Sequence, residues 1–443
     1  EILTNATPTV KKEALQSLVT LNPVGNQALA DLATSELDHP DRNVRIAAIE
    51  LLGTIRSLKH LEIITTRGLE DLNLDVRLKA AVACANYGDR SLPQLVPYLN
   101  AAKPEIVEAA ISAIAQIQTR QAEQILWNHL KPDYDWVSNL VRWQKQMLLD
   151  TREWRALKMT IDDYSQRLIS KVLHILSGLG HKRTIAYVRQ MLTSEDARRR
   201  ANAIEALAAL KHRRFIVPIL PLLEMGEDDS GLKPEKIDPQ TLLRELMHVS
   251  DRWLRIGAIL TLAEQSQWAI LKREWYDSEP DPVVRRFTKQ IVMTFDILAK
   301  PDFEVTRVLF LKQTTLFNLL SLDELLPINR AFKLHKFSIG DRIFTEGEMG
   351  TSLYIVYQGK VRMTRKNGNK QMTLSYFEER ESFGDSHLFE ETAHLSSATA
   401  YSDCQLLILS RASFLVLLDL YPKLLSCLGV SSQEGDIFQR DHL

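Results

Sequence analysis

The sequence contains few residue groupings that could perform catalysis. Phosphate-binding loops, zinc hydrolases and serine hydrolases each need a short motif at fixed spacing, and G-x-x-x-x-G-K-[ST], H-E-x-x-H and G-x-S-x-G are all absent. His174 and His248 stand alone within helical patterns, and the acidic residues fall on turns or polar helix faces, where solvation accounts for them. We therefore expect a protein that is not an enzyme.

Cysteine usage and charge narrow the class further. Cys84, Cys404 and Cys427 lie far apart and form no C-x-x-C pair, which predicts buried thiols in a reducing compartment and no metal site. With 55 basic and 56 acidic residues, the chain has no bulk attraction for nucleic acid or an anionic membrane. No apolar run reaches the roughly 18 residues of a spanning helix. We expect a cytoplasmic protein, and because Glu1 opens inside a helical pattern, we expect it to be the soluble end of a longer polypeptide.

A repeated pattern organises the first three hundred residues. A polar turn is followed by an aliphatic-Arg pair and then by small and aliphatic residues at helical spacing. Equivalent positions recur at intervals of 30 to 32 residues, which is the length of one helical hairpin. The copies are His39–Ile55, Asp71–Gly88, Lys103–Ile117, Glu195–Leu210, Ser250–Gln265 and Glu279–Phe295.

Each part of the repeat has a physical role. Asp41, Asp75 and Asp281 are placed to cap or favour a helix N-terminus, and paired alanines allow two helices to approach closely. The pattern resembles HEAT repeats over about residues 1–300. The resemblance implies that a ladder of arginines pairs with acids of adjacent turns; a ligand-binding basic strip is the alternative. The ladder residues are Arg45, Arg77, Arg200, Arg255 and Arg285.

Two segments interrupt the repeats. Residues 120–160 hold four tryptophans and predict a longer helical insertion, whose aromatic cluster either seals the core or offers a partner-binding face. Residues 225–240 are rich in Gly, Pro and charge, which predicts a solvated loop.

After residue 300 the periodicity changes from helical to strand-like. Val305–Lys312 and Thr315–Leu320 predict a helical lead-in over residues 301–331, which ends in a short helix capped by Ser321. From Phe332 onward, short alternating strands are separated by glycine turns, and Asn367-Gly368-Asn369 is a strong hairpin signal. We expect residues 332–443 to form a compact antiparallel barrel.

These turns and strands resemble the cyclic-nucleotide-binding domain family of the catabolite activator protein and the protein kinase A regulatory subunits. The resemblance rests on Ile339-Gly340-Asp341, on Glu346-Gly347 with Gly350, on Leu353–Val356 with Gly359-Lys360-Val361, and on Phe383–Leu388. It implies a β-roll with a ligand pocket for cAMP or cGMP. The implied binding residues are Phe383, Gly384, Asp385, Ser386, His387, Ser396 and Ser397.

The family resemblance also assigns roles within the pocket. A short helix after Gly384 would direct its amides at the cyclic phosphate, and Asp385 would accept a hydrogen bond from the ribose. The family's phosphate-binding Arg falls on Ser396, which offers one neutral hydrogen bond instead of a bidentate, charge-assisted contact. His387 and His394 flank the pocket and either supply a compensating donor or are exposed loop or cassette histidines.

The C-terminal helical segment completes the resemblance. Phe414, Leu417 and Leu418 are implied to form a lid over the ligand. Only about fifteen residues follow, too few for a helix-turn-helix, so we expect no DNA binding by this chain.

The sequence thus predicts an α+β multidomain protein: an N-terminal all-α, HEAT-like superhelical solenoid and a C-terminal antiparallel β-roll with flanking helices. Its expected role is a regulatory module with a cyclic-nucleotide ligand, no other cofactor, and a protein partner on the solenoid. A pure interaction scaffold with a vestigial pocket is the alternative. The order of domains resembles the soluble tail of bacterial transporters of the ATP/ADP-translocase or major-facilitator type, which implies a membrane domain upstream and a location on the cytosolic face.

Overall fold

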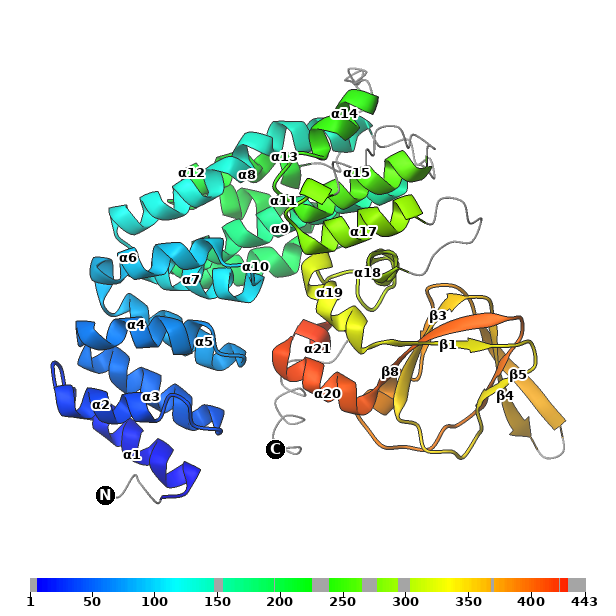
Figure 1. Ribbon diagram of the computed structural model, residues 1–443, viewed down its shortest axis with the longest axis horizontal. Coiled ribbons are helices and arrows are strands. Elements are labelled where there is room, and N and C mark those ends of the chain that lie inside the picture. The colour runs from blue at the N-terminus through cyan, green and yellow to red at the C-terminus, as the bar shows by residue number, and fades with distance from the viewer. Residues whose placement is uncertain are drawn as a thin grey trace. The chain divides into compact units, whose positions relative to one another are not determined.

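The computed structural model describes residues 6–146, 154–194, 196–224, 239–264, 277–293, 303–367, 370–421 and 423–428. The chain divides into two compact units (Figure 1). The first comprises residues 1–149 and 164–236, and the second comprises residues 150–163 and 237–443. Residues 237–300, which belong to the repeat pattern, therefore group with the β-roll. The domain limits predicted from the sequence, 1–300, 301–331 and 332–443, remain predictions. The predicted loop at 225–240 lies almost entirely outside the described residues.

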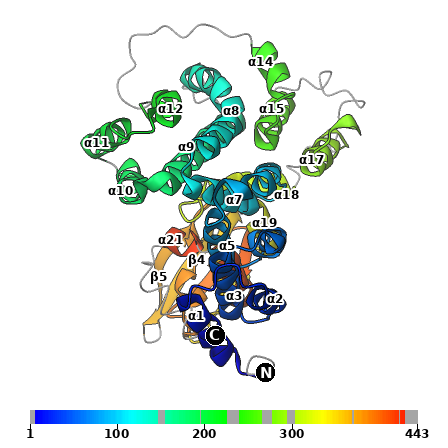
Figure 2. The ribbon, with the colours of Figure 1, turned by 90° about the vertical axis from the view of Figure 1, so that its left-hand side faces the viewer.

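The first unit consists of helices. Successive helices pack as neighbours, α1 on α3, α3 on α5 and α5 on α7, as Figure 2 shows. Its α-helices are α1 (Pro8–Thr20), α2 (Gln27–Ser35), α3 (Arg42–Ile55), α4 (Leu61–Ile63), α5 (Leu74–Ala85), α6 (Leu92–Leu95), α7 (Pro104–Ile117), α8 (Arg120–Gln146), most of α9 (Arg155–Leu176), α10 (Lys182–Leu192), α11 (Ala197–Ala208), α12 (Arg213–Ile216) and α13 (Leu220–Leu223). Shorter helical turns join them: η1 (Leu58–His60), η2 (Ile64–Leu69), η3 (Gly88–Ser91), η4 (Val96–Asn100), η6 (Ser177–His181) and η7 (Val217–Ile219).

Small residues allow these helices to pack closely. Ala47, Ala48, Ala80 and Ala81 are fully buried between neighbouring repeats. A Cβ atom added at Gly53 would lie 2.7 Å from the Cβ of Ala83, so the two backbones approach nearer than any larger side chain permits. The repeat pattern in the sequence therefore reflects a packing requirement.

The arginine ladder forms only in part. Arg45 donates two hydrogen bonds to Asp71, at 2.8 and 3.1 Å, and Arg255 pairs with Glu279 at 3.0 Å. All three of Arg45, Arg77 and Arg255 donate to two carbonyl oxygens of their own turn. Arg77 differs in having no acidic partner among the described residues, because the next turn offers alanines and Lys103 where an acid is needed. At α5 the cap is Asn73, while Asp75 lies in the first turn, where an acidic side chain favours the helix N-terminus as predicted.

Three of the four tryptophans of the predicted insertion at 120–160 lie on the long helix α8, and residues 147–153 of the insertion lie outside the described residues. Trp143 is fully buried, and its ring lies 5.7 Å from that of Trp136. Trp127 contacts Tyr134 and Phe215 at 5.3 and 6.1 Å. These contacts favour the core-sealing role over an exposed partner-binding face.

The second unit begins with helices that lead into the β-roll. They are α14 (Pro239–Leu246), α15 (Arg252–Glu264), α17 (Pro282–Met293), α18 (Glu304–Lys312) and α19 (Leu322–Ala331), joined by residues 155–163 of α9. Ser321 caps α19 through a reciprocal capping box with Glu324, as predicted. The predicted helix at Thr315–Leu320 is wrong, since this segment is a series of turns. The Lys312 ammonium donates hydrogen bonds to the carbonyl oxygens of Asn318 and Leu320, which a continuing helix would use itself.

Two four-stranded antiparallel sheets form the β-roll. Their strand orders are β1-β8-β3-β6 and β2-β7-β4-β5. The strands are β1 (Lys333–Phe337), β2 (Arg342–Phe344), β3 (Ser352–Gln358), β4 (Val361–Asn367), β5 (Lys370–Phe377), β6 (Ser382–Phe383), β7 (Ser397–Ala400) and β8 (Cys404–Ser410). Helices α20 (Arg411–Leu420) and α21 (Lys423–Cys427) follow, and we call them the lid.

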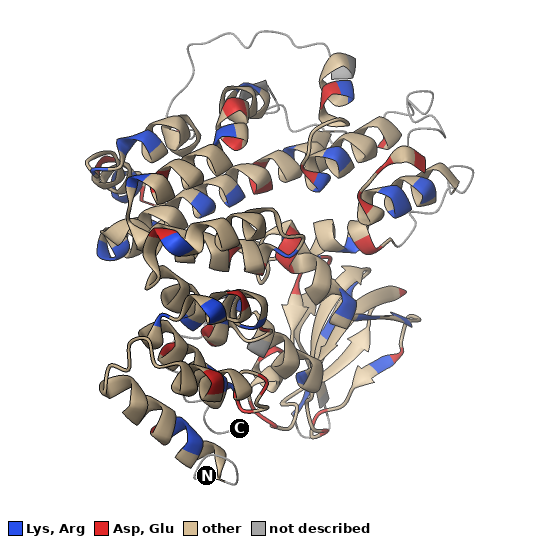
Figure 3. Cartoon of the chain, turned by 60° about the vertical axis from the view of Figure 1, so that its left-hand side comes forward, with Lys and Arg blue, Asp and Glu red and all other residues tan. Residues whose placement is uncertain are grey.

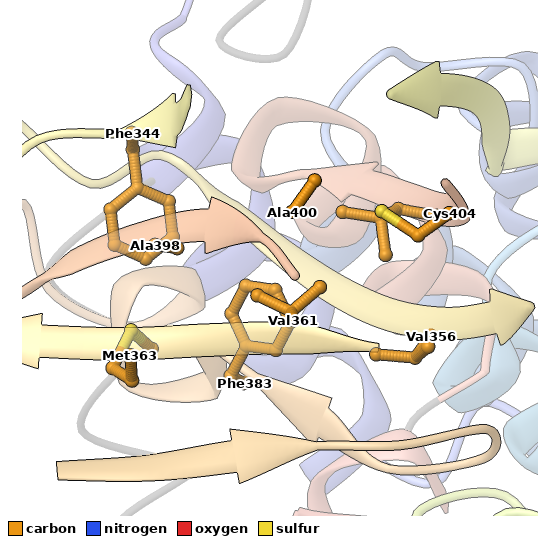
Figure 4. Packing of buried hydrophobic residues seen from close by; sticks show 9 residues of the cluster. Phe344, Val356, Val361, Met363, Phe383, Ala398, Ala400 and Cys404 are labelled. Carbon is orange, nitrogen blue, oxygen red and sulfur yellow. The ribbon is translucent and has the colours of Figure 1, made fainter. Parts of the chain in front are cut away.

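A shared apolar cluster fills the space between the two sheets (Figure 4). Its members are Phe344, Val356, Val361, Met363, Phe383, Ala398, Ala400, Cys404 and Leu406. The predicted fold class, helical repeats followed by an antiparallel β-roll, is confirmed. Among the described residues, no helix has the length and apolar content that crossing a membrane requires.

The Arg45–Asp71 pair is largely buried, so we expect it to contribute measurably to the free energy of unfolding. We expect Asp71→Ala to cost about 2 kcal/mol, since it leaves a largely buried guanidinium without its carboxylate. Glu50→Ala is the matched control, because the Lys79–Glu50 pair also joins adjacent repeats but is about one-third exposed at both ends. Thermal melting followed by circular dichroism should show a larger fall in Tm for Asp71→Ala; equal falls would contradict the assignment.

Candidate ligand-binding site

Gly384 sets the shape of the predicted binding segment. Its φ angle of 83° lies in the left-handed region, and a Cβ atom there would sit 2.7 Å from the carbonyl oxygen of Ser352. The turn delivers the chain from β6 into the short 3₁₀ helix η9, Asp385–Leu388. We call Phe383–Phe389, which includes the residue that ends η9, the cassette. Only glycine allows the cassette to lie this close to β3.

His387 is held inside the fold by a second glycine. Its side chain is 8% exposed and lies where a Cβ atom of Gly350 would be, 2.3 Å from the ring carbon Cγ. The ring nitrogen Nδ1 lies 3.2 Å from the hydroxyl of Thr392. The glycine turn before β3 therefore makes the space that His387 occupies.

His394 lies against His387 and against the barrel core. The two imidazoles meet edge to face at 4.4 Å, and the His394 ring stacks on Phe344 at 3.7 Å. His394 is 5% exposed, so neither histidine is the exposed loop residue that the sequence left open. Burial, followed by the neighbouring His387, lowers the pKa of His394, while Glu348 acts in the opposite direction.

The remaining predicted ligand residues differ in how deeply they are buried. Phe383 is buried and stacks on Tyr354 at 5.1 Å. Asp385 and Ser386 are exposed, and Ser396 is half-buried. Ser397 is buried, and its hydroxyl accepts a hydrogen bond of 2.9 Å from the Glu346 amide. The predicted residues thus lie on β6, on η9 and its preceding turn, and at the start of β7, where Ser397 is already hydrogen-bonded within the protein.

The lid packs directly on the cassette segment. Phe414 is 1% exposed, and its ring meets that of Phe389 edge to face at 5.5 Å. Leu417 and Leu418 are also buried. Arg411, the first residue of α20, pairs with Glu391 at 2.7 Å. A change in the position of the cassette would therefore be transmitted to the lid through packed side chains.

Several contributors were not predicted from sequence. Phe344, Tyr354 and Phe389 supply the aromatic contacts to His394, Phe383 and Phe414. Phe344 and Tyr354 lie in predicted strands, and their alternation marks them as inward-facing, but nothing local indicates which ring they meet.

The buried His394 predicts a pH dependence of stability. Because its pKa is lower in the folded chain than in the unfolded chain, the unfolded chain binds the proton first as the pH falls below about 6.5. The Tm should therefore fall between pH 7.5 and 5.5. His394→Phe, which keeps the stack on Phe344, should reduce this fall, whereas His335→Phe, a change at an exposed histidine of β1, should not. Equal pH profiles for the two variants would contradict the prediction.

Comparisons with known proteins agree with this geometry. Residues 334–421 match the cyclic nucleotide-binding domain, and residues 66–143 match HEAT repeats. A cyclic AMP receptor protein from Thermus thermophilus is 34% identical over 113 residues, which cover 25% of this chain and 52% of that protein. The chain thus spans about half the length of this relative.

Solved structures are similar over the same region. The catabolite activator protein of Thermus thermophilus is 29% identical, covering 29% of this chain and 60% of its own, with a TM-score of 0.26. A cAMP-bound PfPKA-R is 31% identical, covering 27% and 43%, with a TM-score of 0.25. The two family matches, and not these structures, show that the chain combines HEAT repeats with a cyclic nucleotide-binding domain.

Proposed function

We propose that this chain is a non-enzymatic regulatory module. Its β-roll takes a cyclic nucleotide, cAMP or cGMP, and its helical repeats contact a protein partner. The observation that carries the proposal is the direct packing of the lid on the cassette, through Phe414 and Phe389, in a domain of the cyclic nucleotide-binding family. A ligand shifts such an equilibrium only by its different affinity for the two lid positions.

The cassette fits part of a cyclic nucleotide. Gly384 and the turn of η9 provide backbone amides close to β3, and Asp385 is an exposed acceptor that could bind a ribose hydroxyl. No arginine lies at Ser396 to neutralise the phosphate, so the chain relies on neutral donors. His387 and His394 are the two imidazoles beside the cassette, and their rings contact each other.

A second function remains a candidate on a specific observation. His387 and His394 are buried against each other and against Phe344, and Ser397 is bonded to Glu346. A β-roll whose polar groups are satisfied internally could serve as a scaffold without a ligand. The two functions differ in one respect: only the regulatory one requires the lid to respond to nucleotide.

The first turn of α19 connects the lid to the repeat helices of the second unit. Glu324 pairs with Lys423 of α21 at 2.6 Å, and neighbouring Asp323 accepts a hydrogen bond of 2.9 Å from the indole of Trp253 in α15. The Leu322 amide donates to Asp163 of α9 at 3.0 Å. Burial alone would raise the pKa of Glu324, but Lys423 and the donors of Ser321 hold it below its usual value. We call this set of contacts the α19 joint.

The joint offers a physical route for regulation. Asp163 is 1% exposed, and α9 continues beyond it to Leu176. If the lid moved on ligand binding, the Lys423–Glu324 pair would transmit the movement to the first turn of α19. That turn also contacts α9 and α15. This supports the regulatory function over the scaffold.

The order of domains also bears on where the protein acts in the cell. We infer that the module serves the cytosolic side of a membrane transporter of the ATP/ADP-translocase type, because the architecture resembles the soluble tails of such proteins. Sedimentation of the native gene product with membranes after cell lysis tests this, and recovery in the soluble fraction alone would contradict it.

Restoring the missing charge predicts a gain in nucleotide affinity. We expect Ser396→Arg to bind cAMP or cGMP roughly 10- to 100-fold more tightly than the unmodified chain, since a charge-assisted contact is worth about 1.5–3 kcal/mol. Ser396→Gln, which adds bulk and no charge, is the control. Calorimetric titration measures both. No gain for the arginine variant over the glutamine variant would contradict a preserved phosphate position.

Breaking the α19 joint should loosen the first turn of α19 and the lid together. Asp163→Asn should speed amide hydrogen exchange about threefold in the first turn of α19 and also in the lid, by mass spectrometry of peptides covering 411–428. Glu324→Gln should have the same effect on the lid by removing the pair with Lys423.

Glu304→Gln is a closely matched control. It breaks the pair with Arg330 at the other end of α19, at 2.7 Å and with side chains 60% and 23% exposed, against 58% and 23% for Lys423 and Glu324. This variant should leave lid exchange unchanged. Lid exchange that Asp163→Asn does not alter would contradict the route.

A further inference from the structure

The first unit carries a row of unpaired cations along one edge. Five turns of this unit, at residues 56–60, 86–91, 118–120, 177–183 and 209–213, each bear at least one exposed Lys or Arg. We call this row the basic edge. Its members, all exposed, are Arg56, Lys59, Arg90, Arg120, Lys182, Arg183, Lys211 and Arg213.

Hydrogen bonds link these turns one to the next. The Tyr87 hydroxyl donates to the carbonyl oxygen of Ser57 at 3.3 Å, and Thr119 donates to Asp89 at 2.5 Å. The Gln118 side chain reaches the carbonyl oxygen of Gly178 at 3.3 Å.

The last link in the row joins two histidines. His181 Nε2 and His212 Nδ1 lie 2.8 Å apart, between the turn before α10 and the turn before α12. The five turns therefore form one continuous row along the same edge.

The cations of this row lack the partners that other charges have. In the described part of the chain, Figure 3 shows acidic and basic residues interspersed on most helices, and many form ion pairs. None of the eight basic-edge residues has an ion pair among the described residues. The acids on these turns are already engaged: Asp89 by Thr119 and Glu123 by His212, at 3.5 Å.

Several of these cations occupy positions that disfavour them. Lys182 and Arg183 begin α10, Arg213 begins α12 and Arg120 begins α8. A helix N-terminus carries partial positive charge and is stabilised by acidic residues, and α10 has none in its first turn. Local violations of this kind are expected where a sequence serves function instead of stability. The net charge of the whole chain is only −1, so the row is a local concentration.

We propose that the basic edge binds an acidic, extended segment of a partner protein. Neighbouring helices in such packing lie about 8–10 Å apart, and an extended chain advances about 3.3 Å per residue. Carboxylates on every third residue would therefore meet successive turns, and about twelve residues would span the row. Arginine suits this partner, because its planar guanidinium binds carboxylates through two hydrogen bonds.

An acidic peptide fits better than single-stranded nucleic acid. Sequence-tolerant binding of single strands uses exposed aromatic rings for base stacking. On the described turns of the basic edge, the one aromatic ring besides histidine is Tyr87, which is 7% exposed and uses its hydroxyl within the fold. This proposal does not depend on nucleotide binding by the β-roll.

The test uses the full chain and a fluorescein-labelled fifteen-residue peptide with Glu at every third position. A second peptide of equal composition has its glutamates in one block. At low salt, we expect fluorescence anisotropy to show tighter binding of the spaced peptide, and weaker binding as salt rises. No binding of the spaced peptide at low salt would overturn the proposal.

Paired variants locate the surface. Arg183→Gln with Arg213→Gln should weaken binding about fivefold. Lys103→Gln with Arg198→Gln removes the same charge from exposed residues at the opposite ends of α7 and α11, and should leave binding unchanged. The edge variant should melt no lower than the unmodified chain, because the removed cations lie at helix N-termini. Equal affinity for both variants would overturn the proposal. Tighter binding of a single-stranded RNA or of a phosphatidylserine vesicle, with displacement of the peptide, would also overturn it.

Discussion

A buried carboxylate in α9 constrains how the second unit is assembled. Asp163 is 1% exposed, and a buried charge is costly unless it is paired and hydrogen-bonded. The Leu322 amide and the Lys312 ammonium meet that requirement, at 3.0 and 3.5 Å. Both belong to the segment that leads into the β-roll. The position of α19, and through Glu324 and Lys423 the position of α21, therefore depends on a residue of α9.

The same turn of α19 serves several functions at once. Ser321 and Glu324 cap the helix reciprocally, while Asp323 faces Trp253 and Arg252 of α15. Because the lid contacts the cassette at Phe389, the path from cassette to repeat helix consists of packed side chains and hydrogen bonds within a single unit. A regulatory module needs such a path.

The sequence predicted those features whose causes are local. The helical repeats follow from alanines and aliphatic residues at regular spacing, and Ser321 with Glu324 is a capping box that is visible in four residues. The turn at Gly384 likewise needs a glycine for its own φ angle. The fold class was predictable because these signals agree with one another.

The site was harder to predict because its contacts are distant in sequence. Leu322 and Asp163 are separated by 159 residues, and no pattern links them. The stack of His394 on Phe344 depends on Gly350 leaving room for His387. Arg77 shows the opposite error, since its place in the repeat implied a carboxylate partner that the next turn lacks. Periodicity locates a residue on a helix, whereas its partner depends on the neighbouring turn.

We propose that nucleotide binding at the cassette alters α15 through the α19 joint. Hydrogen exchange of the Ser396→Arg chain, with and without saturating cAMP, measures this coupling. We expect slower exchange in the lid at 411–428 together with a change in α15 at 252–264. Protection of the lid with no change in α15 would contradict it.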